Sequence, residues 1–339
     1  MARTTLIDVA RHCGVSRATV SLVLNDSPLV ADQTAKRVRQ AMSELGYVYN
    51  RAAAALRTQR SDAVGVVMTQ LTNPYFAEFA AGLQDVLTHS GTVPLLAVSG
   101  EDRELQHRLV TSLVERTVDG IVLIPAHGTK AADLPDLLGT PLVLMARRVP
   151  DVDVDYVGAE NREGGYAAAE HLYGHGCRKI AFIGGYLDAS AREERAGGVS
   201  ALLTDHGLAL DQELSVTCEP LRPPARDVTI QLLTDHPDVD GIVCVSDVVA
   251  FGVLDALADL GLRVGSDIRV IGFDDVHDAG LNRPSLSSVA VPARETGRRA
   301  AQLVLERAAG STEPTVREEF PTKFEPRETC GCPRPKPLP

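Results

Sequence analysis

The sequence predicts an α/β protein in which an N-terminal helix-turn-helix head precedes a core of two doubly wound parallel-sheet subdomains. Two observations lead to this prediction. Short helical segments with glycine stops fill the first 48 residues. From Ala63 onward, runs of consecutive apolar residues alternate with helical segments, and the alternation begins again near residue 179. Because strand–helix alternation builds right-handed βαβ units, it indicates parallel sheets.

The apolar runs of the core are typical of strands buried on both faces, because polar residues do not alternate within them. The first half contains AVGVVM (63–68), VPLLAV (93–98), GIVLIP (120–125) and PLVLM (141–145). The second half contains KIAFIGG (179–185), DGIVCVS (240–246) and IRVIGFDD (268–275). We expect helices at 76–89, before 120, and near 161–174, 190–206, 225–235 and 248–261. From about Val291 the chain is expected to cross back to the first half.

The head has the spacing of a helix-turn-helix, in which the second helix enters the major groove of DNA. Thr5 can cap a first helix that runs to about Cys13, and Gly14 can take the positive φ of a tight turn. A second helix follows, with Ser16 as its N-cap and Val20 and Val23 packed on the first helix. The second helix is expected at 17–25 and a third at 32–45.

Charge is distributed unevenly along the chain. The net charge is −11, yet residues 1–60 hold nine lysines and arginines against four acids, a net +5 that leaves −16 for the rest. A basic head on an acidic body indicates a polyanionic partner. The sequence shows no apolar run long enough for a membrane span and no signal-peptide core, so we expect a cytoplasmic protein.

The sequence favours neither an enzyme nor a metalloprotein. It contains no dinucleotide-binding G-x-G-x-x-G after the first strand, no Walker A loop and no G-x-S-x-G elbow. Of six scattered cysteines only Cys330 and Cys332 are close together, without a second pair at zinc-ribbon spacing. The acidic run around Asp274 has no second cluster to support a metal site. We therefore predict no catalytic residues, no metal and no cofactor.

The segment YNRAAAALRTQRS (49–61) has the pattern of a minor-groove wedge. Its alanines favour a helix of about two turns, which is marginal in water by itself. Small residues allow the backbone to approach DNA, and Leu56 is a side chain that could insert between base steps.

At this point the chain resembles the LacI/GalR family of transcriptional regulators, through TLIDVARHCGVSRATVSLVLN and AMSELGYVYNRAAAALR. The resemblance implies a palindromic operator bound by a homodimer, with Arg17 and Ala18 at base-reading positions. Leu22 departs from the arginine that many members carry there, so the outer operator bases should differ from theirs. The implied DNA-binding residues are Thr5, Leu6, Ser16, Arg17, Ala18, Thr19, Ser21, Leu22, Asn25, Thr34, Tyr47, Asn50, Ala53 and Leu56.

The core resembles the periplasmic-binding-protein-like domain of the same family, where a ligand binds between the subdomains. Side chains that follow the predicted strands face this cleft, because ligands bind outside the carboxyl ends of parallel strands. Carboxylates, guanidinium groups and aromatic faces there suit a polyol such as a sugar. The resemblance implies effector contacts from Arg195, in an R-x-x-G pattern, and from Asp274. The full predicted set is Asn73, Tyr75, Phe76, Arg147, Arg192, Arg195, Asp247 and Asp274.

Two departures bear on the effector. Ala146 stands where many sugar-binding members have aspartate, and Ser246 stands where the family commonly has asparagine. Ala146 removes an acceptor for a ligand hydroxyl and weakens an assignment to lactose-like or ribose-like ligands, and Ser246 leaves one hydrogen-bonding position in doubt. The SLVL helix, Ala146-Arg147 and REERAGG look most like the maltose-system branch of the family.

These observations predict a DNA-binding repressor whose operator affinity changes with a small effector; the alternative is a solute-binding protein of a transporter, in which the basic head would have no role. The predicted domains are the head (1–48), a hinge (49–61), the effector-binding core (62–329) and a proline-rich tail (330–339). Within the core, one subdomain comprises about 62–160 and 291–322, and the other about 161–290 and 323–329.

Overall fold

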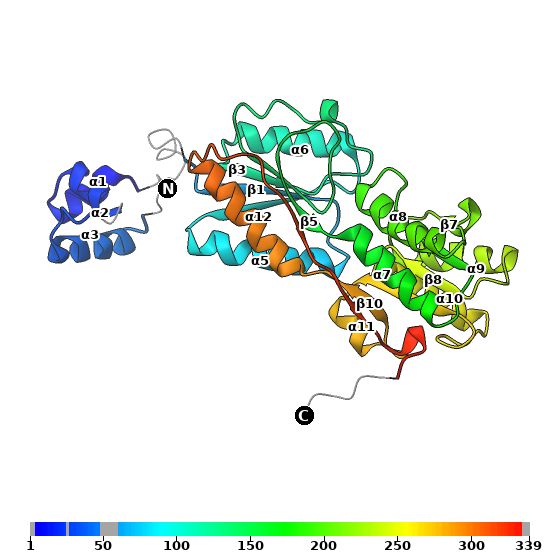
Figure 1. Ribbon diagram of the computed structural model, residues 1–339. Helices are drawn as coiled ribbons and strands as arrows, with labels where there is room; N and C mark the ends of the chain where they lie inside the picture. Colours follow the sequence, from blue (N-terminus) through cyan, green and yellow to red (C-terminus); the bar gives the residue numbers. More distant parts are fainter. Residues whose placement is uncertain (1–3, 25–26, 48–59, 334–339) are drawn as a thin grey trace. The chain divides into compact units, whose positions relative to one another are not determined.

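The computed structural model describes residues 4–24, 27–47 and 60–333, and it divides the chain into two compact units, Met1–Ser61 and Asp62–Pro339. The predicted fold class is confirmed: a small helical unit is followed by two parallel-sheet subdomains (Figure 1). Four predicted DNA-binding residues lie outside the described residues, namely Asn25, Asn50, Ala53 and Leu56. Most of the predicted hinge and of the predicted tail also lie outside them.

The head consists of three helices around a small valine-rich core that includes Val9, Val20, Val23 and Val38. A capping box starts the first helix, because Thr5 Oγ1 accepts a hydrogen bond from Asp8 N (3.3 Å) and Asp8 Oδ2 accepts one from Thr5 N (2.9 Å). Gly14 ends this helix with φ of 65°, as its position predicted. The helices are α1 (Leu6–Cys13), α2 (Arg17–Leu24) and α3 (Asp32–Glu44).

Each subdomain of the core contains one six-stranded sheet. The first has the order β11-β5-β4-β3-β1-β2 and is parallel throughout. Its strands are β1 (Ala63–Met68), β2 (Val93–Val98), β3 (Gly120–Leu123), β4 (Leu142–Met145), β5 (Asp155–Ala159) and β11 (Arg317–Phe320). The second has the order β12-β10-β9-β8-β6-β7, with only β12 antiparallel to its neighbour. Its strands are β6 (Ile180–Ile183), β7 (Ser215–Val216), β8 (Gly241–Cys244), β9 (Arg269–Asp274), β10 (Ser287–Ala290) and β12 (Lys323–Glu325).

Helices cover both sheets. The bounds are α5 (Pro74–His89), α6 (Arg103–Glu115), α7 (Asn161–Gly174), α8 (Ser190–Asp205), α9 (Arg222–Asp235), α10 (Asp247–Asp259), α11 (His277–Leu281) and α12 (Ala293–Ala308), with 3₁₀ turns η1 (Ala131–Asp133), η2 (Gln212–Leu214) and η3 (Glu328–Cys330). Helix α5 begins two residues before its predicted start, because Asn73 caps it by accepting a hydrogen bond from Tyr75 N (3.0 Å). Among the described residues, no helix combines the length and apolar character needed to cross a bilayer.

The chain crosses between the subdomains after β5, after β10 and after β11. The second crossing brings α12 back onto the first subdomain, where it lies along α5 (orange and cyan in Figure 1). The third runs directly from β11 in the first sheet to β12 in the second. The strands β5, β7, β10, β11 and β12 were not foreseen individually, because they are short or lack a continuous apolar run.

Helices α7 and α8 cross closely because a glycine lies on each side of the contact. A Cβ on Gly165 would lie 2.1 Å from the carbonyl oxygen of Arg195, and one on Gly198 would lie 2.0 Å from that of Arg162. Neither backbone could move away without separating the helices. The crossing therefore sets the position of α8, which carries Arg195.

We expect Gly165→Ala to lower the free energy of unfolding by about 1–3 kcal/mol, because the added methyl overpacks the contact between α7 and α8. Gly174→Ala is the matched control at the end of the same helix, where no atom lies within 4 Å of an added Cβ. It should be neutral or stabilising by about 0.5–1 kcal/mol. Urea denaturation measures both, and an equal stability of the two variants would contradict the proposed close crossing.

Candidate functional site

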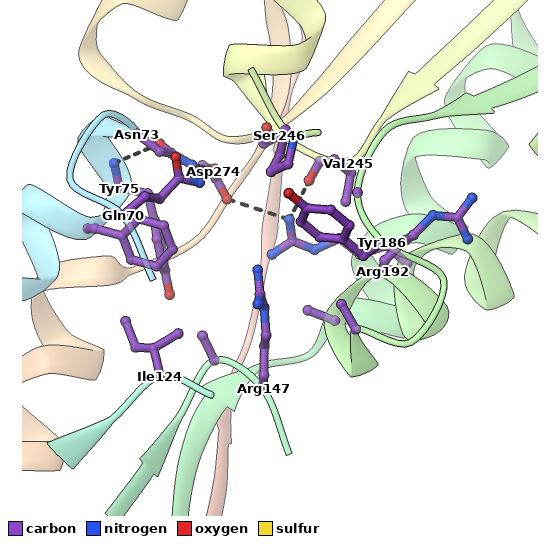
Figure 2. Close-up of a pocket in the computed structure, with 17 residues that line it drawn as sticks. Gln70, Asn73, Tyr75, Ile124, Arg147, Tyr186, Arg192, Val245, Ser246 and Asp274 are labelled. Atoms are coloured by element: carbon purple, nitrogen blue, oxygen red, sulfur yellow. Dashed lines mark hydrogen bonds and ion pairs between the residues drawn. The ribbon is translucent and has the colours of Figure 1, made fainter. Parts of the chain in front are cut away.

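A cavity of about 600 Å³, including space open to solvent, lies between the two subdomains. Both sheets contribute loops to it from the carboxyl ends of their strands, where parallel-sheet proteins bind ligands. Figure 2 shows its lining side chains, with Asn73 and Asp274 close together and Arg147 extending into the space from another loop. The lining residues are Gln70, Asn73, Tyr75, Phe76, Ile124, Ala146, Arg147, Gly185, Tyr186, Ala189, Ala191, Arg192, Arg195, Pro220, Val245, Ser246 and Asp274.

Asp274 is the only carboxylate among these lining residues, and its side chain is 3% exposed. Its Oδ2 accepts a hydrogen bond from Asn73 Nδ2 (3.0 Å), so the contact joins the two subdomains. Its Oδ1 lies 3.6 Å from Arg195 Nη1. Burial raises the pKa of Asp274 to about 6, although Arg195 and the Asn73 hydrogen bond favour the ionised form.

Arg195 is positioned by contacts with three other segments of the second subdomain. Its Nε donates to Asn161 Oδ1 (2.8 Å) at the start of α7, and its Nη1 donates to the carbonyl of Val245. The guanidinium carbon lies 3.7 Å from the centre of the Phe273 ring, a cation–π geometry. A guanidinium fixed in this way presents its remaining N–H groups to the cavity without further loss of conformational entropy.

Backbone strain is concentrated at the ends of strands that reach the cavity. Asp274, the last residue of β9, has φ of 105°, and Asp275, directly after β9, has φ of 53°. Ala146, directly after β4, has φ of 61°. Non-glycine residues rarely adopt positive φ, and such strain persists where the surrounding structure enforces it, as in ligand-binding sites.

Two further arginines line the cavity, and their partners differ. Arg147 pairs with Glu101 through two hydrogen bonds of 2.8 Å, and it also donates to the carbonyl of Pro125. Arg192 donates to the carbonyl of Gly184 (2.9 Å) and to Ser215 Oγ (3.1 Å). Arg147 is therefore neutralised by a carboxylate, whereas Arg192 forms no ion pair with any described acid.

Aromatic side chains form the apolar part of the cavity. Tyr75 and Phe76 meet edge to face, with ring centres 5.3 Å apart, at the start of α5. From the other subdomain Tyr186 stacks on His127, whose Nδ1 lies 2.8 Å from Asp188 Oδ1. The His127 contacts form a second link across the cleft.

The structure does not bring Asp247 to the cavity, in contrast to its predicted place in the ligand site. Asp247 is fully buried at the start of α10, where its carboxylate accepts hydrogen bonds from Ser288 Oγ (2.6 Å) and Val276 N (2.8 Å). Burial and the nearby Asp274 raise its pKa. The hydrogen bond from Val276 N holds the Asp247 side chain away from the cavity. The same bond fixes the position of the loop after β9.

The other seven predicted effector residues all line the cavity. The predicted set omitted Gln70 and Tyr186 among the polar lining residues, and it treated Ser246 only as a departure from the family's asparagine. Gln70 and Tyr186 follow strands β1 and β6 within three positions, so a wider window after each strand would have included them. The neighbour of Arg147, Arg148, turns away instead and pairs with Glu194 and Glu319.

The head residues at predicted base-reading positions lie on an exposed face of α2. Arg17 and Ala18 are exposed, and Arg17 forms no hydrogen bond or ion pair with another residue in the described part of the chain. Ser16 Oγ accepts a hydrogen bond from Thr19 N (3.0 Å), and the two hydroxyls also interact (2.9 Å). No acidic residue lies on α2, so the helix presents no negatively charged side chain.

The remaining predicted DNA-contacting residues differ in exposure. Leu22 is 36% exposed, and Thr5, the N-cap of α1, is also exposed. Ser21 and Thr34 are half-buried. Leu6 and Tyr47 are half-buried and pack against the head core.

A three-helix unit with an acid-free second helix, together with a cavity between two parallel-sheet subdomains, defines a ligand-responsive DNA-binding regulator. Residues 5–50 match the protein family described as "Bacterial regulatory proteins, lacI family". Residues 169–330 match the family described as "Periplasmic binding protein-like domain". The chain belongs to the LacI family of bacterial regulatory proteins.

Relatives match over nearly the whole chain. The HTH-type transcriptional regulator CelR of Thermobifida fusca is 35% identical over 339 residues, covering 96% of this chain and 98% of CelR. The ribose operon repressor of Halalkalibacterium halodurans is 32% identical over 330 residues, covering 96% and 97%. The maltose regulon regulatory protein MalI of Escherichia coli is 30% identical over 306 residues, covering 87% and 90%.

Solved structures of other proteins share the fold of this chain. A CelR–cellobiose complex superposes with a TM-score of 0.73 at 34% identity, covering 96% of this chain and all of CelR. The lac repressor dimer bound to operator superposes with a TM-score of 0.87 at 24% identity, covering 97% and 99%. The likeness to the lac repressor, at 24% identity, shows that the two proteins share a fold.

The raised pKa of Asp274 predicts a specific pH dependence of stability. Its folded-state value of about 6 exceeds the ordinary 3.8, so the folded protein binds this proton more tightly and loses stability as pH rises through that interval. Between about pH 5 and pH 8, the free energy of unfolding of wild type should fall by about 1 kcal/mol relative to that of Asp274→Asn. Urea denaturation at both pH values measures this, and parallel pH profiles would contradict it.

Proposed function

We propose that this chain is a transcriptional repressor that binds a palindromic operator as a homodimer, and that a sugar or sugar derivative controls its operator affinity. Family membership and the repressor names of its relatives support the DNA-binding half. The basic head supports it independently, since charge of this sign favours DNA. We further propose that the protein acts on chromosomal DNA in the cytoplasm and has no catalytic role.

One observation carries the effector half: the buried pairing of Asp274 and Arg195 at the edge of a cavity that also contains aromatic faces. A carboxylate accepts hydrogen bonds from hydroxyls and a guanidinium donates to them. Tyr75 and Tyr186 offer flat surfaces for the C–H faces of a sugar ring. Because a relative at 34% identity forms a cellobiose complex, we propose cellobiose as the first candidate.

The mechanism we propose uses the contacts that bridge the cleft. Asn73 with Asp274, and His127 with Asp188, join the subdomains directly. A ligand that enters between them would exchange these contacts for its own and change the angle between the subdomains. The first strand begins at Ala63, immediately after the predicted hinge, so this movement would be passed to the DNA-binding segment. Coupling of this kind is typically about 1–3 kcal/mol.

We expect the full-length protein to retain palindromic duplexes from its own genome, with affinity that falls steeply as salt rises. Arg17→Ala should weaken operator binding by about 1–3 kcal/mol and relax selectivity at one base pair in each half-site. The matched control is Arg108→Ala, which removes the same charge from an exposed position on α6. Fluorescence anisotropy measures both, and equal affinities for the two variants would contradict the role of Arg17.

We expect Asp274→Asn to lower effector affinity about 10–100-fold, the effect of losing a hydrogen bond to a charged acceptor, while operator affinity without effector is retained. Asp255→Asn is the matched control, because Asp255 pairs with Arg222 on the surface. Calorimetry with cellobiose, maltose, ribose, glucuronate and glucose 6-phosphate identifies the ligand class. An effector that binds both variants equally would contradict the assigned pocket.

A further inference from the structure

Four metal-binding side chains from distant parts of the sequence meet on the second subdomain, away from the cavity residues. His171 and His175 lie one helical turn apart at the end of α7, on the same face. Cys330 and Cys332 follow from η3, more than 150 residues later, and both are free thiols. Neither pair has a part in the DNA-binding or effector-binding roles proposed above.

The distances among three of the donor atoms suit one metal ion. Cys332 Sγ lies 3.6 Å from His171 Nε2 and 3.5 Å from His175 Nε2, and these three atoms lie within 4.8 Å of one another. Cys330 Sγ lies 3.1 Å from His171 Nε2 but is not within 4.8 Å of all three atoms. A tetrahedral zinc ion with bonds of about 2.05 Å to nitrogen and 2.3 Å to sulfur requires nitrogen–sulfur separations of about 3.6 Å.

We propose that His171, His175 and Cys332 bind a zinc-class transition metal ion, with the Cys330 thiol beside the site. Thiolate and imidazole are the ligands that zinc prefers, whereas calcium and magnesium take oxygen ligands. The histidine pair has the H-x₃-H spacing common in zinc sites. The two cysteines are separated by one residue, fewer than in most zinc sites, and that residue is Gly331.

Gly331 lets the chain turn so that both cysteines approach α7. Its φ of 89° is in the region that favours glycine, and an added Cβ would lie 2.8 Å from the carbonyl oxygen of Gly265.

The surrounding contacts fix the cysteine backbone before any ion binds. Cys330 N donates a hydrogen bond to Ser287 Oγ (3.2 Å) on β10, and Cys330 is fully buried. The ring of His171 packs on Phe324 of β12, with centres 4.4 Å apart. A bound ion would therefore join α7 to the last described turn of the chain and hold that turn against the second sheet.

The test uses full-length protein, stripped of metal and kept reduced with a phosphine, and titrated with Co²⁺. One equivalent per chain should bind, with intense visible absorption of a tetrahedral ion and a near-ultraviolet thiolate-to-cobalt band. Zn²⁺ should displace Co²⁺ and raise the melting temperature, because it binds only the folded state. Cys332→Ser and His175→Ala should each weaken binding at least about 100-fold, and the Cys330→Ser/Cys332→Ser double variant should lose the thiolate band.

Cys218→Ser and His89→Ala serve as controls, because both residues lie outside the cluster and both variants should bind Co²⁺ like wild type. The proposal is overturned if wild type binds less than about half an equivalent or shows no thiolate band. It is also overturned if the Cys332 and Cys218 variants bind equally. The readout uses neither DNA nor effector, so its failure leaves the repressor assignment intact.

Discussion

The pairing of Asp274 with Arg195 is the interaction on which the cleft depends. Neither charge can be solvated by bulk water, because both side chains are almost completely buried. Each must therefore be stabilised by fixed groups, and these come from separate elements: Asn73 from the first subdomain, Asn161 from α7 and the carbonyl of Val245 after β8. A pair held in this way has a defined orientation and can respond to a ligand only by changing partners.

Close helix packing supports this arrangement from outside the cavity. The glycine contacts between α7 and α8 place Arg195 and Asn161 side by side, and α12 packs on α5 through similar glycines at positions 82 and 297. The second contact ties the returning chain to the helix that begins at Asn73. Both sides of the cleft thus rest on helix pairs that cannot slide without backbone clashes, which favours movement of whole subdomains over local loop changes.

The segment after β12 packs into the second subdomain, as the predicted bounds of that subdomain (to residue 329) imply. Thr329 accepts a hydrogen bond from Ser287 N (2.8 Å) and donates one to the carbonyl of Val270 (2.8 Å), so the segment after β12 is part of the sheet's packing. Glu328 likewise accepts hydrogen bonds from Ser285. These contacts are what bring Cys330 and Cys332 to the histidines of α7.

The sequence by itself determined the features that depend on residues close to one another along the chain. The cap at Thr5, the turn at Gly14, the apolar strands such as 63–68 and the alternation that defines the fold class all follow from local patterns. Seven of eight predicted effector residues line the cavity, because strand ends in parallel sheets converge. Only the tertiary structure decided that Asp274 faces the cavity while Asp247 turns inward, and that the H-x₃-H pair meets the C-x-C pair. Those outcomes depend on which hydrogen-bond partners remote segments bring together, and no local pattern contains that information.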